Sequence, residues 1–474
     1  MSGHCRIEKL GRPGVYVCTD NFVHDAESAA EDVGMPRVRI VTVQAADYYR
    51  LRDTDEAIMP VAEAVIDKLI DGLRRPLTPE EESTEPQKEP LDPITIEAET
   101  YELAVREFNQ IFLDNQWGDG LPLLPPTREA VEAMLKGTSR SPDELIGTVA
   151  PKNGAATIEK IAVNSVMAGA KPEYLPVIIA AMEGITDPDY DDLHVMTSTG
   201  SFNFAIMVTG PIAQEINVNS GMGFLGYGWQ ANSTIGRALR LCLINMGRVW
   251  PGVNDMALVG RPSQQFYVFA ENQQFSPWPP FHVTQGFKPE DSCVTISSVM
   301  GASSDLLGGG AVATWTPEEI LDNVVSMMMR PRAGMAYWKR GSSNPGPMKY
   351  ILFFEPALAM EFDQQGHTRE SLQKLIYERA SIPYEQLIPA EIANIQPRID
   401  SGEIPADRVP VFKAGLKPGG RLPMLDRIED IRIIVVGGIP SYSFAMSFWR
   451  EGLYAPTSDQ TKLIRGATLT KSGR

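Results

Sequence analysis

The sequence has few of the residues that most often build metal centres and disulfide frameworks. Of 474 residues, five are histidine and four are cysteine. The cysteines, Cys5, Cys18, Cys242 and Cys293, include no C-x-x-C pair, which argues against a cysteine zinc site and a disulfide framework. An H-E-x-x-H motif and a phosphate-binding G-x-x-x-x-G-K-[S/T] loop are absent as well.

Long apolar runs and excess positive charge are also missing. No stretch reaches the roughly 18 to 20 apolar residues of a membrane helix, and the start MSGHCRIEKLGRPG lacks the apolar core of a secretory signal. We therefore expect a cytoplasmic protein without membrane contact. The net charge of −17 repels nucleic-acid phosphates, so nucleic acid is not an expected partner.

The composition, 43% hydrophobic and 22% charged, is typical of a globular chain with two or more structural units. Residues 1–76 read as a small α/β unit, with strands GVYVCTDNF and VRIVTV, a helix between them, and a helix over 55–75. Residues 77–95 are a Pro/Glu-rich linker. A unit of about 75 residues buries little core alone, so it is expected to dock on the main domain or on another chain.

Residues 96–474 are the expected main domain, and a division into halves at 96–300 and 301–474 is an alternative. FAIMVTGP, YVFAE, CVTISSV, KYILFFEP and IRIIVVGG read as buried strands, and AATIEKIAVNSVMAG as a helix that stops at Gly169. This order predicts an α/β or α+β fold, a large mixed-sheet body with the small N-terminal α/β unit. The apolar stretches 204–213 and 431–440 both turn at glycine, which does not establish a repeat.

A glycine-rich loop, NSGMGFLGYGW, precedes a helix that we expect to be capped by Asn232 or Ser233 and to stop at Gly247. Such a loop, with Gly226 in it, binds anions through backbone N–H groups and the helix dipole. Its glycines match G-x-G-x-x-G, but the preceding strand lies too far away for a dinucleotide fingerprint. No nicotinamide dinucleotide is expected.

Further candidate substrate-binding residues surround this loop. Arg237 and Arg240 lie three apart on the helix and offer guanidinium groups suited to a carboxylate, with a solvated or interface ion pair as the alternative. Cys242 falls on the apolar stripe of the same helix, so we expect it in the core. Asn232, Gly226, Trp278 and Asp255 complete the substrate-binding set.

Three residues are candidates for acid–base catalysis. Glu271 ends the strand FYVFAE, and His282 ends the aromatic run FSPWPPFH, so the carboxylate is placed to orient or deprotonate the imidazole. His194 follows an acidic turn and precedes the polar stretch MTSTGSFN. A packing role for His282 and an exposed loop position for His194 are the alternatives. A divalent metal held by His194, His282 and Glu271 or Asp255 has no motif behind it, which leaves the cofactor unknown.

VCTDNFVHDAESAAEDVGMPRVRIVTV, with the helix and PLTPEE after it, resembles the second half of the UGSC-type (seleno)protein domain. The reactive motif of that domain, selenocysteine or cysteine followed by Gly-Ser-Cys, is absent, and only Cys5 lies upstream. The main domain resembles an uncharacterised bacterial family through DGLPLLPPT, GAATIEKIAVNSVMAG, ANSTIGRALRL, NMGRVWPGVND, AENQQFSPWPPFHV and GFKPEDSCVT. The resemblance implies chemistry at a C–S or C–N bond and a separate redox subunit as partner.

These patterns predict an enzyme that acts on a small polar metabolite at a C–S or C–N bond by acid–base or metal-assisted chemistry. Lyase, hydrolase and reductase classes stay open. The alternative is a noncatalytic scaffold or binding subunit of a multi-subunit redox enzyme, and the missing Gly-Ser-Cys motif favours it. In either case we expect a homo-oligomer.

Overall fold

The structure is a computed structural model. It describes residues 4, 8, 10–23, 26–27, 30, 35, 37–45, 54–82, 94–190, 192–257, 260, 266–299, 301–305, 316–329, 346–387, 389–402, 404, 406–425, 427–438, 445–452 and 459–468. With 46% helix and 16% strand in several mixed sheets, the expected α/β or α+β fold class is confirmed.

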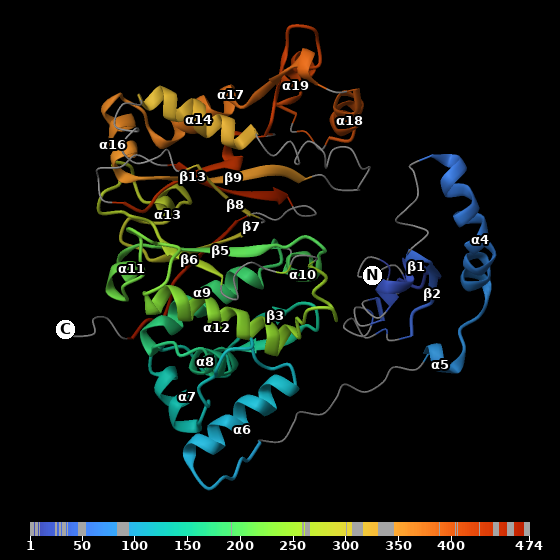
Figure 1. Cartoon of the computed structure of the whole chain (residues 1–474), viewed down its shortest axis with the longest axis vertical. Coiled ribbons are helices and arrows are strands. Elements are labelled where there is room, and N and C mark those ends of the chain that lie inside the picture. The colour runs from blue at the N-terminus through green and yellow to red at the C-terminus, as the bar shows by residue number, and fades with distance from the viewer. Residues whose placement is uncertain are drawn as a thin grey trace.

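The main domain has four layers, in which two facing sheets are enclosed by helices on both outer sides (Figure 1). The first sheet has the order β14–β7–β5–β6 and the second β12–β9–β13–β8. The strands are β5 (Asn203–Thr209), β6 (Tyr267–Ala270), β7 (Cys293–Val299), β14 (Gln460–Leu463), β8 (Gly301–Asp305), β9 (Gly346–Phe354), β12 (Ile431–Val435) and β13 (Ala445–Gly452). All five strands predicted in this domain are therefore present.

Helices cover the outer faces of both sheets. Those on the first sheet are α9 (Leu175–Ile185) and α12 (Gln230–Gly247), with α8 (Ile158–Met167) packed on these two helices; those on the second are α14 (Pro317–Met329), α16 (Pro356–Gln364) and α17 (Arg369–Arg379). The remaining elements of this domain are α6 (Tyr101–Asp114), α7 (Arg128–Leu135), β3 (Leu145–Val149), β4 (Gly154–Thr157), η2 (Pro172–Tyr174), α10 (Asp192–Thr197), α11 (Pro211–Glu215), α13 (Phe281–Thr284), β10 (Ser381–Pro383), η4 (Tyr384–Gln386), α18 (Pro389–Asp400), α19 (Val409–Gly415), β11 (Arg421–Pro423) and η5 (Ile428–Asp430).

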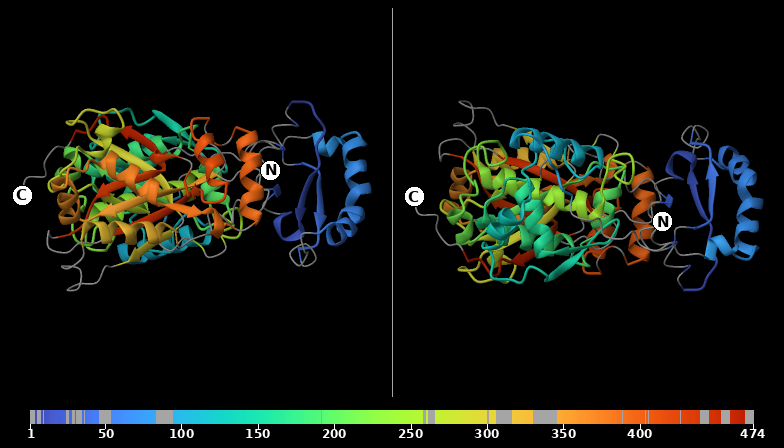
Figure 2. Two further views of the ribbon diagram at one scale, coloured as in Figure 1. Left: turned by 90° about the horizontal axis from the view of Figure 1, so that it is seen from above. Right: turned by 90° about the horizontal axis from the view of Figure 1, so that it is seen from below.

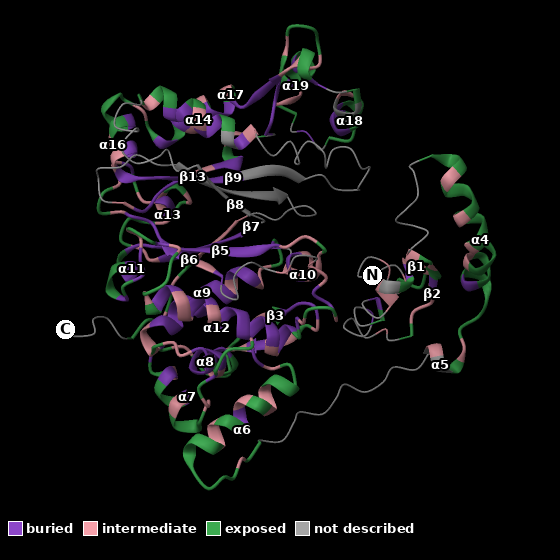
Figure 3. Cartoon of the chain, in the orientation of Figure 1, coloured by how far each residue is buried: buried purple, intermediate pink, exposed green. Residues whose placement is uncertain are grey.

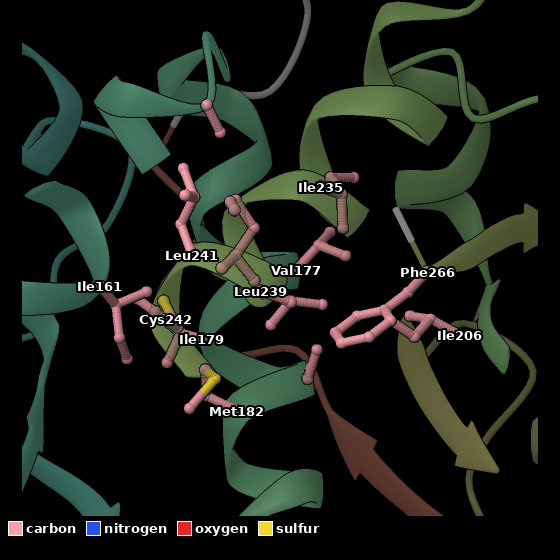
Figure 4. Close-up of a cluster of buried hydrophobic side chains, with 14 of the residues drawn as sticks. Ile161, Val177, Ile179, Met182, Ile206, Ile235, Leu239, Leu241, Cys242 and Phe266 are labelled. Carbon is pink, nitrogen blue, oxygen red and sulfur yellow. The ribbon is translucent and has the colours of Figure 1, made fainter. Parts of the chain in front are cut away.

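The central strands are apolar on both faces because each face meets a different layer. In β5, Phe204, Ile206 and Val208 join the core beneath α9 and α12, whereas Ala205 and Met207 face the second sheet. Figure 4 shows the helix side of this core, with Cys242 among aliphatic side chains. Alternate residues of the inner strands thus form an inter-sheet layer, which we define as Ala205, Met207, Phe224, Phe269, Phe281, Val299, Ile351, Phe353, Ile434 and Val436.

The two sheets have the same plan, and the first contains an edge strand from the second half of the chain. In both, one parallel pair (β5 with β6, β9 with β12) is extended by two antiparallel strands. β7 ends at Val299 in the first sheet, and β8 begins at Gly301 in the second. β14 follows β13 of the second sheet along the chain but pairs with β7 of the first. Stretch 204–213 therefore corresponds in position to β9, and not to the strand at 431–440 that it resembles in sequence.

Two helix starts differ from expectation. α12 begins at Gln230 after Trp229, so the predicted caps Asn232 and Ser233 are wrong, and the helix ends at Gly247 as predicted. The predicted helix at 155–169 begins at Ile158, because residues 154–157 pair with β3 and Thr157 caps the helix by accepting the N–H of Lys160. Gly169 ends that region with a φ of +77°, as its position predicted.

The N-terminal unit lies to one side of the main domain (Figure 2). It contains β1 (Tyr16–Thr19), η1 (Asp20–Phe22), β2 (Ile40–Val43), α4 (Asp55–Arg74) and α5 (Pro79–Glu82), with β1 and β2 parallel. The predicted helix between these strands and most of the linker at 77–95 fall largely outside the described residues. Within the described part of the chain, none of the helices has both the length and the apolar character needed to cross a membrane.

Candidate active site between the two sheets

Two buried glutamates lie where parallel-paired strands end in the facing sheets. Glu271 follows β6 and Glu355 follows β9, and the two residues are 3% and 0% exposed, respectively. Phe269 and Phe353, each two positions earlier, belong to the inter-sheet layer, so strand alternation directs both carboxyl groups into that layer. The carboxyl ends of parallel strands are the usual place for ligands in α/β sheets.

Backbone hydrogen bonds join these strand ends across the two halves. The N–H of Asn272 donates to the carbonyl of Val435 at 2.8 Å, and its side-chain amide donates to the carbonyl of Gly437 at 3.3 Å. The N–H of Gly437 donates to the carbonyl of Ser220 at 2.7 Å. The ends of β6 and β12 and the loop after α11 are therefore held together around the two glutamates.

Glu271 is held by a cation and a backbone amide. Arg369, at the start of α17, donates from Nη2 to one carboxylate oxygen at 2.8 Å, and the N–H of Phe281 donates to the other at 2.7 Å. Arg369 also donates to the carbonyl of Pro279 at 2.8 Å. Burial raises the pKa of Glu271, while Arg369 and the Phe281 amide oppose this effect. The pair joins the first sheet to a helix that covers the second.

Glu355 has no cationic partner among the described residues. One carboxyl oxygen accepts the N–H of Leu358 at 3.3 Å and caps α16, but the other, Oε1, is buried without a hydrogen bond. Gly438 lies against this side chain with a φ of +65°, and a Cβ there would come within 2.6 Å of the Glu355 Cγ. Burial raises the pKa of Glu355. Glu355 is thus suited to remain a neutral acid.

His282, on α13, is completely buried. Its Nε2 donates to the carbonyl of Lys288 at 3.0 Å, and Nδ1 is buried without a hydrogen bond. His282 lies close enough to Glu271 to lower the pKa of that carboxyl group slightly. Among the described residues, however, the hydrogen bonds to the Glu271 carboxylate come from Arg369 and the Phe281 N–H, and not from His282. His282 is therefore a buried neighbour of Glu271.

His194 lies at the other end of the first sheet. It belongs to α10, which precedes the first residue of β5, whereas Glu271 N–H bonds to Val208 near the last residue. The seven-residue strand β5 lies between them and spans roughly 20 Å. Figure 1 shows α10 and α13 towards opposite ends of the sheets. The structure does not bring together His194 with His282 and Glu271, and within the described ranges no group of three His, Cys, Asp or Glu residues could hold a metal.

Arg237 binds a carboxylate of the protein itself. Its Nε and Nη2 donate to the two carboxylate oxygens of Asp119 at 2.8 and 2.9 Å, and Nη2 also donates to the carbonyls of Leu121 and Pro122. This fork fastens the Pro-rich loop to α12. The sequence left a solvated or interface ion pair open as the alternative; the structure contains an ion pair within the chain, in which the Asp119 side chain is 3% exposed.

Asn232 and Arg240 also make contacts within the protein. The Asn232 side chain accepts the N–H of Asn219 at 2.8 Å and donates to the carbonyl of Val268 at 2.8 Å, which ties the glycine-rich loop to β6. The Arg240 guanidinium carbon lies 4.3 Å from the centre of the Phe266 ring. These groups hold the fold around the loop.

The remaining predicted binding residues are dispersed. Gly226 lies in the exposed part of the glycine-rich loop, where Tyr227 is 94% exposed. The Trp278 indole donates to the carbonyl of His367 at 3.1 Å. Asp255 is buried and accepts the N–H of Ala257 at 3.2 Å. Of the predicted site residues, the structure brings together Glu271, His282 and Trp278. Trp278 is linked to Glu271 by Arg369, whose guanidinium carbon lies 5.9 Å from the Trp278 ring centre.

A second ion pair, partly buried, borders the same layer. Arg432 of β12 donates from Nε to Asp459 at 3.3 Å, and the Ser297 hydroxyl of β7 donates to the other Asp459 oxygen at 2.6 Å. Burial lowers the pKa of Arg432, while nearby carboxylates oppose this effect. These groups border a cavity of about 10 Å³, which is room for about one water molecule. Phe281 borders the cavity and its N–H also donates to Glu271, so both ion pairs adjoin the same part of the inter-sheet layer.

Sequence reasoning missed Glu355, Arg369, Arg432 and Asp459. A signal for Glu355 was present, because FYVFAE and YILFFE are both apolar strands that end in glutamate. Arg369 and Asp459 lie 98 and 162 positions from the residues they bind, and spacing carries no information over such separations. Cys242, which was expected in the core, is fully buried, and burial raises its thiol pKa.

Comparison with protein-family models, curated proteins and solved structures gives no match to this chain. The resemblance to the UGSC-type domain therefore stays a prediction.

Proposed function

We propose that the protein is an enzyme that acts on a small polar metabolite at the strand ends that border the inter-sheet layer, with Glu271 and Glu355 as its acid–base pair. The observation that carries the proposal is the unpaired, fully buried oxygen of Glu355 at the end of a parallel-paired strand. An unsatisfied buried polar atom costs about 1–3 kcal/mol, and such a cost is typical of functional sites.

The different surroundings of the two carboxyl groups support different roles. Arg369 favours the ionised form of Glu271, which suits a base, whereas Glu355 has no cation beside it in the described part of the chain and suits an acid. In an elimination, Glu271 takes a proton from carbon, a carbon–carbon double bond forms, and the C–S or C–N bond breaks. The leaving sulfur or nitrogen takes the proton of Glu355. A lyase of this kind is the reaction class that we propose.

The test is turnover by the purified full chain of thioether- and amino-substituted carboxylic acids, read as released thiol or ammonia. We expect release from at least one of them, and a loss of roughly 10²–10⁴-fold in kcat for Glu271→Gln and for Glu355→Gln. Glu378→Gln, on the exposed side of α17, is the matched control and should retain activity. No release by the wild-type chain rejects the lyase class, and full activity of both variants rejects the acid–base pair.

A noncatalytic scaffold is the second candidate function. Its support is that Arg237 and Asn232, which were expected to bind substrate, are occupied by protein groups. Under this function, Glu271→Gln and Glu355→Gln should leave binding of a partner chain unchanged. For the location of either function we propose the cytoplasm, since the described cysteines Cys18, Cys242 and Cys293 are all free thiols.

A further inference from the structure

Arg369 has one buried donor that no group in the described part of the chain accepts. Its Nη2 donates to Glu271 and its Nη1 donates to the carbonyl of Pro279, both at 2.8 Å. Its Nε–H is buried without a hydrogen-bond partner, and the residue is only 3% exposed. Buried guanidinium donors are normally satisfied. This N–H is therefore suited to an acceptor that the described residues do not supply.

The direction of this N–H is fixed by the two hydrogen bonds of the same group. Nε and Nη2 form one edge of the planar guanidinium and point the same way. In Arg237 this edge binds both oxygens of Asp119, at 2.8 and 2.9 Å. In Arg369 it binds one oxygen of Glu271, since the other oxygen accepts the N–H of Phe281 at 2.7 Å. An acceptor at Nε therefore lies beside the Glu271 carboxylate.

We infer that Arg369 binds the carboxylate of the substrate through Nε, and that the substrate is a carboxylic acid with its sulfur or nitrogen substituent on carbon 3. This inference rests on the proposed function. A guanidinium edge matches carboxylate oxygens, and carbon 2 is two bonds from the bound oxygen, so it lies next to Glu271.

The proton transfers then follow from this placement. Glu271 takes the proton from carbon 2, and the electrons of that C–H bond form the double bond between carbons 2 and 3. The C–S or C–N electrons leave with the sulfur or nitrogen, which takes the proton of Glu355. While the substrate is bound, one guanidinium faces two carboxylates, and their repulsion makes Glu271 a stronger base. The substrate thus activates the group that deprotonates it.

The pair of Arg369 and Glu271 lies close beneath the surface. Burial raises the pKa of Glu271, and the Gln273 amide is among the groups that lower it, so the two side chains are neighbours. Gln273 is half-buried and Gln274 is exposed. Figure 3 shows exposed segments around α13, next to the buried strands of the two sheets. Residues 273–277 therefore separate the pair from solvent on this side.

The test is binding of 3-(methylthio)propanoate and of its uncharged amide, 3-(methylthio)propanamide, to the purified full chain by titration calorimetry. We expect the carboxylate to bind about tenfold or more tightly than the amide. Arg369→Lys keeps a cation beside Glu271 but lacks the two-donor edge, so it should lose most of this preference. Arg237→Lys, at the edge that Asp119 already fills, is the matched control and should keep the preference.

The wild-type comparison decides the inference even if Arg369→Lys does not fold. A carboxylate that binds the wild type no more tightly than its amide overturns the inference, and so does an unchanged preference in folded Arg369→Lys.

The position of the substituent separates this inference from the proposed function. Of 3-(methylthio)propanoate and 2-(methylthio)propanoate, we expect only the first to release methanethiol, because the proton comes from carbon 2 and the substituent leaves from carbon 3. Release from the second rejects the inference but keeps the lyase. Carboxylate-selective binding without release from either compound supports the carboxylate site and rejects the lyase.

Discussion

Replacement of Arg369 by methionine should destabilise the main domain strongly. The Arg369 and Glu271 side chains are 4% and 0% exposed and are joined at 2.8 Å. Methionine fills much of the same space but leaves the Glu271 carboxylate without its cation. Removal of one partner of a buried ion pair typically costs about 3–5 kcal/mol, and we expect a loss of that size in the free energy of unfolding.

The same helix offers a control. Arg379 binds Glu318 and Asp322, whose side chains are 55% and 72% exposed. Exposed pairs contribute about 0–1 kcal/mol, so Arg379→Met should cost less than about 1 kcal/mol. The assay is urea unfolding followed by circular dichroism and tryptophan fluorescence. A loss for Arg369→Met as small as that for Arg379→Met would refute the reasoning.

A double substitution and the pH dependence separate charge from packing. In Glu271→Gln/Arg369→Met no buried charge is left, so the loss should be at least about 2 kcal/mol smaller than the sum of the single losses. A carboxyl group whose folded-state pKa is raised loses stability as pH rises through its range. The penalty of Arg369→Met should therefore shrink as the pH falls and Glu271 becomes protonated. A pH-independent penalty would indicate lost packing instead of a buried charge.

Three further predictions concern other contacts. The pKa of Glu355 is raised above the ordinary 4.5, so the stability of the wild type should fall as the pH rises above that value. Glu355→Gln should lack this decrease. Parallel curves of melting temperature against pH for the two proteins would contradict the prediction. Arg237→Lys loses the two-atom grip on Asp119 and should cost about 1–2 kcal/mol; unchanged protease cleavage at 119–122 would contradict it. Gly210→Ala puts a Cβ 2.1 Å from a backbone oxygen, whereas Gly286→Ala meets nothing within 4 Å at the same φ of +89°, so the first should cost at least about 2 kcal/mol more in thermal unfolding.

The sequence predicted which segments form strands better than it predicted which strands pair with each other. Apolar runs such as FAIMVTGP identify buried strands, because a strand between two layers is apolar on both faces. The pairing of β14 with β7 could not be predicted, since it joins positions more than 160 residues apart. A strand's apolar pattern does not identify its neighbour.

For the candidate site, residue type was informative and residue role was not. Glu271 was found because a carboxyl group at the end of a buried strand is unusual. Arg237 was read as a substrate-binding group because the sequence does not reveal Asp119, which occupies its fork. Charge partners depend on the tertiary structure, so a buried arginine cannot be assigned to substrate or protein from its helix position alone.

The position of β14 in the first sheet has a consequence for how the chain withstands proteolysis and folding. The 96–300 half lacks one strand of its sheet, so a fragment that ends at residue 300 would leave β7 with an open edge, whereas the 301–474 half contains all four strands of the second sheet. Open edges invite aggregation. We therefore expect that the 96–300 half is insoluble alone but assembles with the 301–474 half when the two are co-refolded. A nick between the halves should leave the two fragments associated until the first sheet unfolds.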